Sequence, residues 1–132
     1  MCVDSQATLS VYLCDNYGAL RDLMRFALED DRRIAVVGEA EDAITCVREL
    51  PELRPDVLVL DLRMPGVTGL EAVPDVRTAS PDTRIVVYSQ HIDDRTEAEL
   101  EEAGVEAWLR KDEALSELRA PVLRVGGLEP AA

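Results

Sequence analysis

The chain has 132 residues, about the length of one domain and enough to bury a single hydrophobic core. No apolar run approaches the roughly 20 residues needed to cross a bilayer, and the N-terminus lacks the basic and apolar regions of a signal peptide. We therefore expect a cytoplasmic protein that does not contact the membrane. The net charge is −13, from 27 acidic against 14 basic residues, which argues against direct nucleic-acid binding by this chain.

Five apolar segments alternate with amphipathic ones along the chain. They are rich in valine, isoleucine and leucine with little polar alternation, which is typical of parallel strands covered on both faces. The predicted strands are 9–14, 33–38, 56–61, 84–89 and 105–110.

The intervening segments have helical spacing. We expect helices at 18–30, 41–50, from 68 onward, at 95–103 and at 113–124. In the first, Leu20, Leu23, Met24, Ala27 and Leu28 form the predicted buried face, with Arg21, Asp22 and Arg25 outward. The second presents Ile44, Val47 and Leu50 on its predicted buried face.

Capping and proline signals refine these helices. Thr68 and Glu71 form a capping box that opens the third helix, and Asp94 with Glu97 opens the fourth, which Gly104 closes. Proline disrupts a helix interior. We therefore expect Pro51 to stop the second helix, Pro74 to leave the third short or kinked, and Pro121 to interrupt the fifth.

Five β-α units joined by short connections predict an open, parallel, doubly wound α/β sheet. We expect the domain to span 9–125, with an N-terminal tail at 1–8 and a linker or free tail at 126–132. In such sheets, ligands gather at the carboxyl ends of the strands. The polar residues at those ends are Asp15, Asn16, Asp61, Ser89, Gln90 and Lys111.

These strand ends carry a recognisable chemistry. Asp15 and Asp61 would repel each other unless a cation lies between them, and oxygen ligands without histidine or thiolate suit Mg²⁺. A hydroxyl from Ser89 and the ammonium of Lys111 can hold an anion beside that metal. Together the four groups indicate phosphoryl transfer onto a carboxylate. Taken singly, each strand-end acid or hydroxyl can equally be a helix cap or a turn residue.

Lys111 is harder to explain as an ordinary surface charge. It is the only lysine in a chain that carries 13 arginines. A compact ammonium fits a tight phosphoryl pocket where a planar guanidinium does not. The three cysteines carry no comparable signal. Cys2, Cys14 and Cys46 are widely spaced and odd in number, which fits neither a disulfide framework nor a metal cluster, and Cys14 is expected to be a buried apolar residue.

The segments "VVGEAEDA" and "VLVLDLRMPGVTGLEAV", with Asp15, Ser89 and "WLRKD" after the first, fourth and fifth strands, closely resemble response-regulator receiver domains of two-component signalling. The resemblance runs from residue 9 to about 119 and is strongest to receivers that precede LuxR-type helix-turn-helix domains. It implies a flavodoxin-like sheet with the strand order 2-1-3-4-5.

The resemblance also implies roles for individual residues. Asp61 would accept a phosphoryl group from a sensor histidine kinase. Asp15 and the backbone carbonyl of Arg63 would help bind Mg²⁺, Ser89 would hydrogen-bond the phosphoryl group, and Lys111 would neutralise it. Such a domain is a regulated switch and not a turnover enzyme.

The output of the switch is less defined by the sequence. Trp108 occupies the position of the aromatic side chain that changes rotamer on activation in such domains; the alternative is a partly buried strand aromatic. His91 reads as an ordinary loop residue. We expect transcriptional control through an output domain that this chain does not contain, or a stand-alone regulator, and a homodimer formed through the receiver surface.

Asn16 departs from the family pattern, which places a second metal-binding acid there. An amide oxygen still binds Mg²⁺, but the site loses one formal charge and should bind the ion weakly. A second hypothesis is therefore a receiver-like protein-binding module that works without phosphorylation. A third is a phosphohydrolase of the haloacid-dehalogenase type with Asp61 as nucleophile. Such enzymes need a second acidic residue two positions after the nucleophile, and this chain has Arg63 there.

Overall fold

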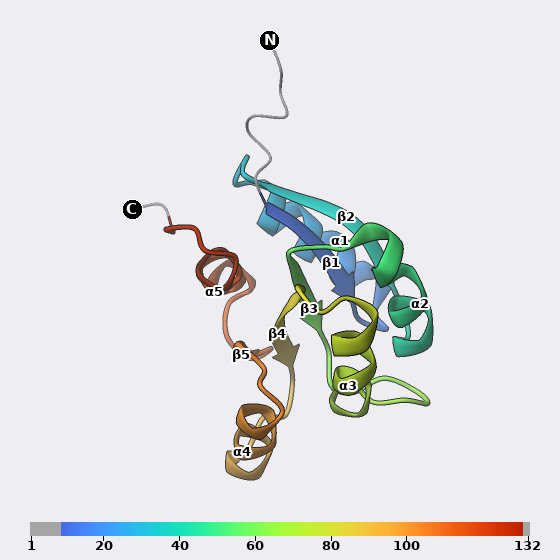
Figure 1. The fold of residues 1–132 in the computed structure, drawn as a ribbon. Coiled ribbons are helices and arrows are strands. Elements are labelled where there is room, and N and C mark those ends of the chain that lie inside the picture. Colours follow the sequence, from blue (N-terminus) through green and yellow to red (C-terminus); the bar gives the residue numbers. More distant parts are fainter. Residues whose placement is uncertain (1–8, 131–132) are drawn as a thin grey trace.

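The computed structural model describes residues 9–130 (Figure 1). The expected tail at 1–8 and the last two residues of the expected tail at 126–132 lie outside this range. Five parallel strands form one sheet in the order β2-β1-β3-β4-β5, which confirms the doubly wound fold. The strands are β1 (Leu9–Cys14), β2 (Ile34–Ala40), β3 (Val57–Leu60), β4 (Arg84–Ser89) and β5 (Ala107–Arg110).

Helices cover both faces of the sheet (Figure 1). They are α1 (Gly18–Glu29), α2 (Ala43–Leu53), α3 (Gly69–Ala79), α4 (Asp94–Glu102), the 3-10 helix η2 (Leu115–Leu118) and α5 (Arg119–Val125). Buried residues of α1, η2 and α5 share one core cluster, and buried residues of α2, α3 and α4 share the other. All four residues of β3 are buried, because both core clusters press on this central strand. Among residues 9–130, no helix is long and apolar enough to span a membrane.

The prolines disturb the helices less than the sequence predicts. Helix α2 continues through Pro51 to Leu53 and ends where Arg54 adopts a left-handed conformation, with φ of 44°. Helix α3 has 11 residues and includes Pro74, so of the two expected outcomes, a short or a kinked helix, the short one is wrong. The capping box between Thr68 and Glu71 is confirmed. Each proline removes only one intrahelical hydrogen bond, and packing of both helices on the core outweighs that cost.

The last two helices also differ from their predicted form. Residue Asp93, not Asp94, caps α4, because its carboxylate accepts a hydrogen bond from the amide of Thr96. The single helix predicted over 113–124 is wrong: η2 comes first and α5 follows it. Pro121 is the third residue of α5, where a missing N–H costs no intrahelical bond.

Two predicted helix faces are wrong in part. Leu23 and Ile44 are 57% and 65% exposed, although both were assigned to buried faces. Arg21, predicted to face outward, is mostly buried, with a side chain only 16% exposed. Helical geometry explains the exchange in α1, since residues advance by roughly 100°. Arg21 lies three residues before the buried Met24, about 60° around the helix, whereas Leu23 lies one residue before it.

Cys14 is buried within the core, as expected. Its sulfur lies 3.6 Å from the sulfur of Met64. Contact with Cys46 and burial together raise the pKa of the Cys14 thiol, which keeps it protonated and unreactive. Cys14 and Cys46 are both free thiols, and Cys2 lies outside the described residues.

Candidate functional site

Asp15 and Asp61 lie beside each other at the carboxyl ends of β1 and β3. These two strands flank the point where the strand order reverses, which is where doubly wound sheets bind ligands. The amide of Asp61 donates to the carbonyl of Cys14 (3.0 Å), so the sheet ladder itself fixes the spacing of the two acids. Their exposed fractions are only 1% and 3%.

The ammonium of Lys111 pairs with both buried carboxylates. Its Nζ lies 2.7 Å from Asp15 Oδ2 and 3.2 Å from Asp61 Oδ2. Burial alone would lower the pKa of Lys111, but the hydrogen bonds and charges of the two acids outweigh it and raise that pKa. The rings of Tyr17 and Tyr88 lie 5.7 and 5.9 Å from Nζ, within the range of cation–π attraction. The sole lysine therefore remains charged at the centre of the site.

Asp61 also accepts two hydrogen bonds on its other oxygen. Oδ1 lies 3.1 Å from the hydroxyl of Ser89 and 3.2 Å from the backbone amide of Arg63. Burial raises the pKa of Asp61, the charge of Lys111 lowers it, and the charge of Asp15 raises it again, with a net upward shift. Donors and a cation thus surround a desolvated carboxylate, as an acceptor of an anionic group requires.

The metal-binding expectation finds support in an unpaired oxygen. The side-chain Oδ1 of Asn16 is buried and has no hydrogen-bond partner in the described part of the chain. Asp15 Oδ1 accepts from the amide of Tyr17 (2.9 Å), while Oδ2 has only its ion pair with Lys111. An orphaned buried amide oxygen beside a carboxylate suits a hard, oxygen-preferring cation such as Mg²⁺. Within residues 9–130, no group of three or more His, Cys, Asp and Glu side chains is placed to hold a metal.

Two glycines shape this corner, and the sequence reasoning missed their role. A Cβ atom on Gly69 would lie 2.2 Å from the backbone oxygen of Asp61, so α3 begins against that carbonyl only because residue 69 has no side chain. Gly66 has φ of 81°, which lets the loop after Met64-Pro65 turn back toward the helix. The available signal was the glycine inside the capping box, at the first helical position of α3.

The remaining candidate residues lie outside the immediate site. Trp108 on β5 is partly buried, and its Nε1 donates to Oε2 of Glu97 on α4 (3.2 Å). Arg110 reaches the same carboxylate at 3.4 Å, so β5 and α4 are tied by polar contacts. Gln90 and His91 are exposed in the loop after Ser89. The part of Trp108 in switching remains a prediction.

The comparison with protein families decides the assignment. The sequence-family model described as the response regulator receiver domain matches residues 11–123 of this chain. The chain belongs to the response-regulator receiver family. Receiver domains of this family are signalling domains that interact with histidine kinases, generally bind Mg²⁺ at the phosphorylation site and can dimerise.

Similar proteins include transcriptional regulators. The response regulator GacA of Pseudomonas aeruginosa is 30% identical over 117 residues, covering 89% of this chain and 55% of GacA. The transcriptional regulatory protein LiaR of Bacillus subtilis is 33% identical over 122 residues, covering 92% and 58%. The chain therefore spans about half the length of the curated relatives it matches.

Solved receiver structures have the same fold. A LuxR-family response regulator from Aurantimonas sp. SI85-9A1 superposes with a TM-score of 0.83 at 30% identity, covering 92% of this chain and 88% of that one. The receiver of the putative NarL of Mycobacterium tuberculosis gives 0.84 at 28% identity, with 91% and 97% coverage. The receiver of RcsB from Salmonella enterica, solved in the presence of the phosphomimetic BeF₃⁻, gives 0.82 at 25% identity, with 92% and 91% coverage.

Proposed function

We propose that this receiver domain accepts a phosphoryl group on Asp61 from a sensor histidine kinase and passes the change to an output surface. The observation that carries the proposal is the surroundings of Asp61: a buried strand-end carboxylate that meets the ammonium of Lys111, the hydroxyl of Ser89 and a backbone amide. A carboxylate oxygen of Asp61 forms the new O–P bond, and the P–N bond of the donor phosphohistidine breaks. The imidazole leaves with the electron pair and takes up a proton.

The neighbouring side chains then have separate tasks. Lys111 compensates the added negative charge, about −1.5 to −2 at neutral pH. Ser89, already 3.1 Å from Asp61 Oδ1, donates its hydroxyl to a phosphoryl oxygen. Asp15 and Asn16 would hold Mg²⁺, together with Asp61 and the backbone carbonyl of Arg63. When bound, the ion shields the negative charges of the acceptor and of the incoming group.

Asn16 sets the strength of this metal site. A cation there meets two formal carboxylates, Asp15 and Asp61, and one neutral amide oxygen. We therefore propose that phosphorylation requires a higher Mg²⁺ concentration than a site with three acids would need. The unpaired, buried Oδ1 of Asn16 supports this reading, because such an oxygen is costly unless a ligand meets it.

The wider role follows from the relatives. The transcriptional regulatory protein LiaR matches this chain over 58% of its own length, and the response regulator GacA over 55%. We propose that this receiver controls transcription through an output domain, in the cytoplasm, where response regulators typically act. A homodimer through the receiver surface is part of the same proposal, as is the absence of direct nucleic-acid binding by a chain with a net charge of −13.

One observation favours a second candidate function. Asn16 removes an acid from the metal site, as expected if a receiver fold were kept as a protein-binding module without phosphorylation. The third hypothesis, a phosphohydrolase, has less support, because the residue two after Asp61 is the exposed Arg63 and supplies no acid for the leaving group.

Incubation with acetyl phosphate separates the first two candidates. Phosphoryl transfer predicts a retarded band on a phosphate-affinity gel in the presence of Mg²⁺ and none in the presence of EDTA. Acetate is the leaving group in this reaction. No retarded band at saturating Mg²⁺, with a phosphorylatable receiver labelled in parallel, would favour the binding module.

A further inference from the structure

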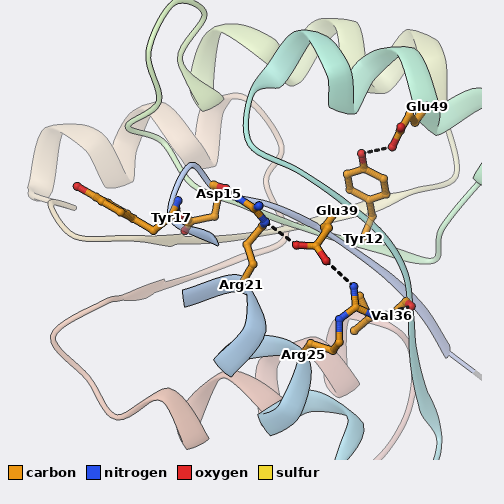
Figure 2. Close-up of polar contacts among 8 residues, drawn as sticks. All are labelled: Tyr12, Asp15, Tyr17, Arg21, Arg25, Val36, Glu39 and Glu49. Carbon is orange, nitrogen blue, oxygen red and sulfur yellow. Dashed lines mark hydrogen bonds and ion pairs between the residues drawn. The ribbon is translucent and has the colours of Figure 1, made fainter. Parts of the chain in front are cut away.

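The side chain of Arg21 joins helix α1 to the ends of both β1 and β2 (Figure 2). Its Nη1 donates to the backbone carbonyl of Asp15, and its Nε donates to Glu39 Oε1 at 2.6 Å. The second oxygen of Glu39 accepts from Nη2 of Arg25 at 2.7 Å. One carboxylate on β2 therefore anchors two arginines of α1, and only Arg21 extends to the metal-binding corner.

Burial makes this link more than a surface ion pair. The Arg21 side chain is 16% exposed, against 36% for Arg25, and Glu39 is 31% exposed. Hydrogen bonds from Arg21 and then Arg25 lower the pKa of Glu39, so the anchor stays ionised at neutral pH. A partly buried, charge-assisted contact of this kind holds geometry better than an exposed pair does.

Arg21 contacts the backbone carbonyl of Asp15, which belongs to the peptide that joins Asp15 to Asn16. Asp15 is 1% exposed, its amide donates to the carbonyl of Ala40, and its Oδ1 accepts from the amide of Tyr17. Asp15 Oδ2 has its ion pair with Lys111, and Arg21 supplies the partner for the backbone carbonyl oxygen. Without it, a buried carbonyl would lose its partner and the peptide plane would be free to rotate.

We propose that Arg21 is a positioning residue: it fixes the peptide that joins Asp15 to Asn16 and so aims their side-chain oxygens at the metal site. This inference rests on the proposed Mg²⁺-dependent function. Arg21 touches neither the metal nor the phosphoryl group; it acts through the backbone. Glu39 on β2 holds Arg21 through Oε1, and Arg25 binds the other carboxylate oxygen of Glu39.

The guanidinium shape is essential to this role. Arg21 uses two nitrogens of one rigid plane to reach the carbonyl and the carboxylate together. A lysine at this position keeps the charge, but its single nitrogen cannot reproduce the planar fork. We therefore expect Arg21→Lys to rescue stability better than it rescues metal affinity.

The test compares Arg21→Gln with Arg25→Gln. Both variants remove one charge from α1 and one contact with Glu39, but only the first removes the contact with Asp15. Calorimetric titration of the unphosphorylated protein with Mg²⁺ should give about tenfold weaker binding in Arg21→Gln, the lower end of the effect expected for residues that orient metal ligands. Affinity in Arg25→Gln should stay within about twofold of the wild type. Equal Mg²⁺ affinity in the two variants would overturn the proposal.

A second readout does not depend on the metal. The amide of Tyr17 donates to Asp15 Oδ1, so its hydrogen exchange, followed by NMR, reports how firmly this corner is held. Exchange at Tyr17 should accelerate in Arg21→Gln and remain unchanged in Arg25→Gln at matched global stability. If the wild type binds no Mg²⁺ the proposed function fails, and exchange at Tyr17 alone then decides on Arg21. Unchanged exchange in Arg21→Gln refutes the positioning role.

Discussion

The ammonium of Lys111 lies closer to Asp15 (2.7 Å) than to Asp61 (3.2 Å), the acid proposed to be phosphorylated. The lysine thus lies between two buried acids and compensates the charge of both. A cation bound at Asp15 would take over part of that task. Lys111 would then be free to move toward a phosphoryl group on Asp61. We therefore expect this side chain to stabilise the unphosphorylated fold and to bind the phosphoryl group after phosphorylation.

This relationship predicts that Lys111→Met destabilises the fold. The substitution leaves two carboxylates, 1% and 3% exposed, without a cation. Breaking a buried pair in this way costs about 3 kcal/mol or more of unfolding free energy. Urea denaturation at pH 7 measures the effect, and the loss should diminish toward acid pH, where protonation of Asp61 relieves the repulsion. Added Mg²⁺ should restore part of the loss, and equal stability of variant and wild type would contradict the pairing.

Asp61→Asn should have the opposite effect. Because burial raises the pKa of Asp61 above its ordinary value of 3.8, the native state holds a proton that the unfolded state has released. Stability therefore falls as the pH rises from 3.8 through the raised pKa, and stays lower above it. Asp61→Asn removes that penalty, so it should be more stable than the wild type in urea at pH 7. The gain should shrink toward zero below pH 3.8. If the variant is less stable than the wild type at pH 7, the hydrogen bonds of the Asp61 carboxylate outweigh the cost of its desolvation.

Asn16→Asp should strengthen the metal site. The new carboxylate adds a third formal charge beside the ion, and an interaction of about 1.4 kcal/mol corresponds to a tenfold change in affinity. The Mg²⁺ concentration for half-maximal phosphorylation by acetyl phosphate should fall by about that factor. Asn16→Ala is the matched control and should weaken binding. Unchanged or poorer Mg²⁺ binding in Asn16→Asp would mean that Asn16 is not a ligand.

Trp108 offers a direct view of switching. Phosphorylation should draw Ser89 inward and open space into which Trp108 rotates, which breaks its hydrogen bond with Glu97 on α4. Helix α4 has a single fully buried residue, Leu100, so it is the element most easily displaced. Beryllofluoride with Mg²⁺ should shift the emission of this only tryptophan.

Two variants control the fluorescence measurement. The shift should disappear in Asp61→Asn, which cannot bind the mimic, and should shrink in Ser89→Ala. Unchanged wild-type emission, with NMR showing that the mimic is bound, would refute the switch at Trp108 and leave the phosphorylation site standing.

The sequence predicted the proximity of the strand-end residues better than it predicted the helices around them. Asp15, Asp61, Ser89 and Lys111 each lie at or just after the end of an apolar strand, and parallel strands bring their carboxyl ends together, so proximity followed from topology alone. Helix ends were harder to predict, because packing on the core carried α2 past Pro51 and α3 past Pro74.

Arg21 was misplaced for a different reason. A charged residue in an amphipathic helix is normally assigned to the solvent face, and its partners, Glu39 and a backbone carbonyl, are distant in sequence. Such a contact depends on how α1 crosses β1 and β2. Periodicity within α1 predicted the burial of Met24 and Leu28 but does not contain that information.

The central claim is that Asp61 accepts the phosphoryl group, and intact-mass measurement after treatment with acetyl phosphate and Mg²⁺ tests it most directly. The wild type should gain about 80 Da, the mass of one phosphoryl group that replaces a proton, and hydroxylamine should remove the adduct as expected for an acyl phosphate. Asp61→Asn should gain nothing under the same conditions, while Asp75→Asn, an exposed acid on α3, should label as the wild type does. A hydroxylamine-labile adduct of the same mass on Asp61→Asn would contradict the account.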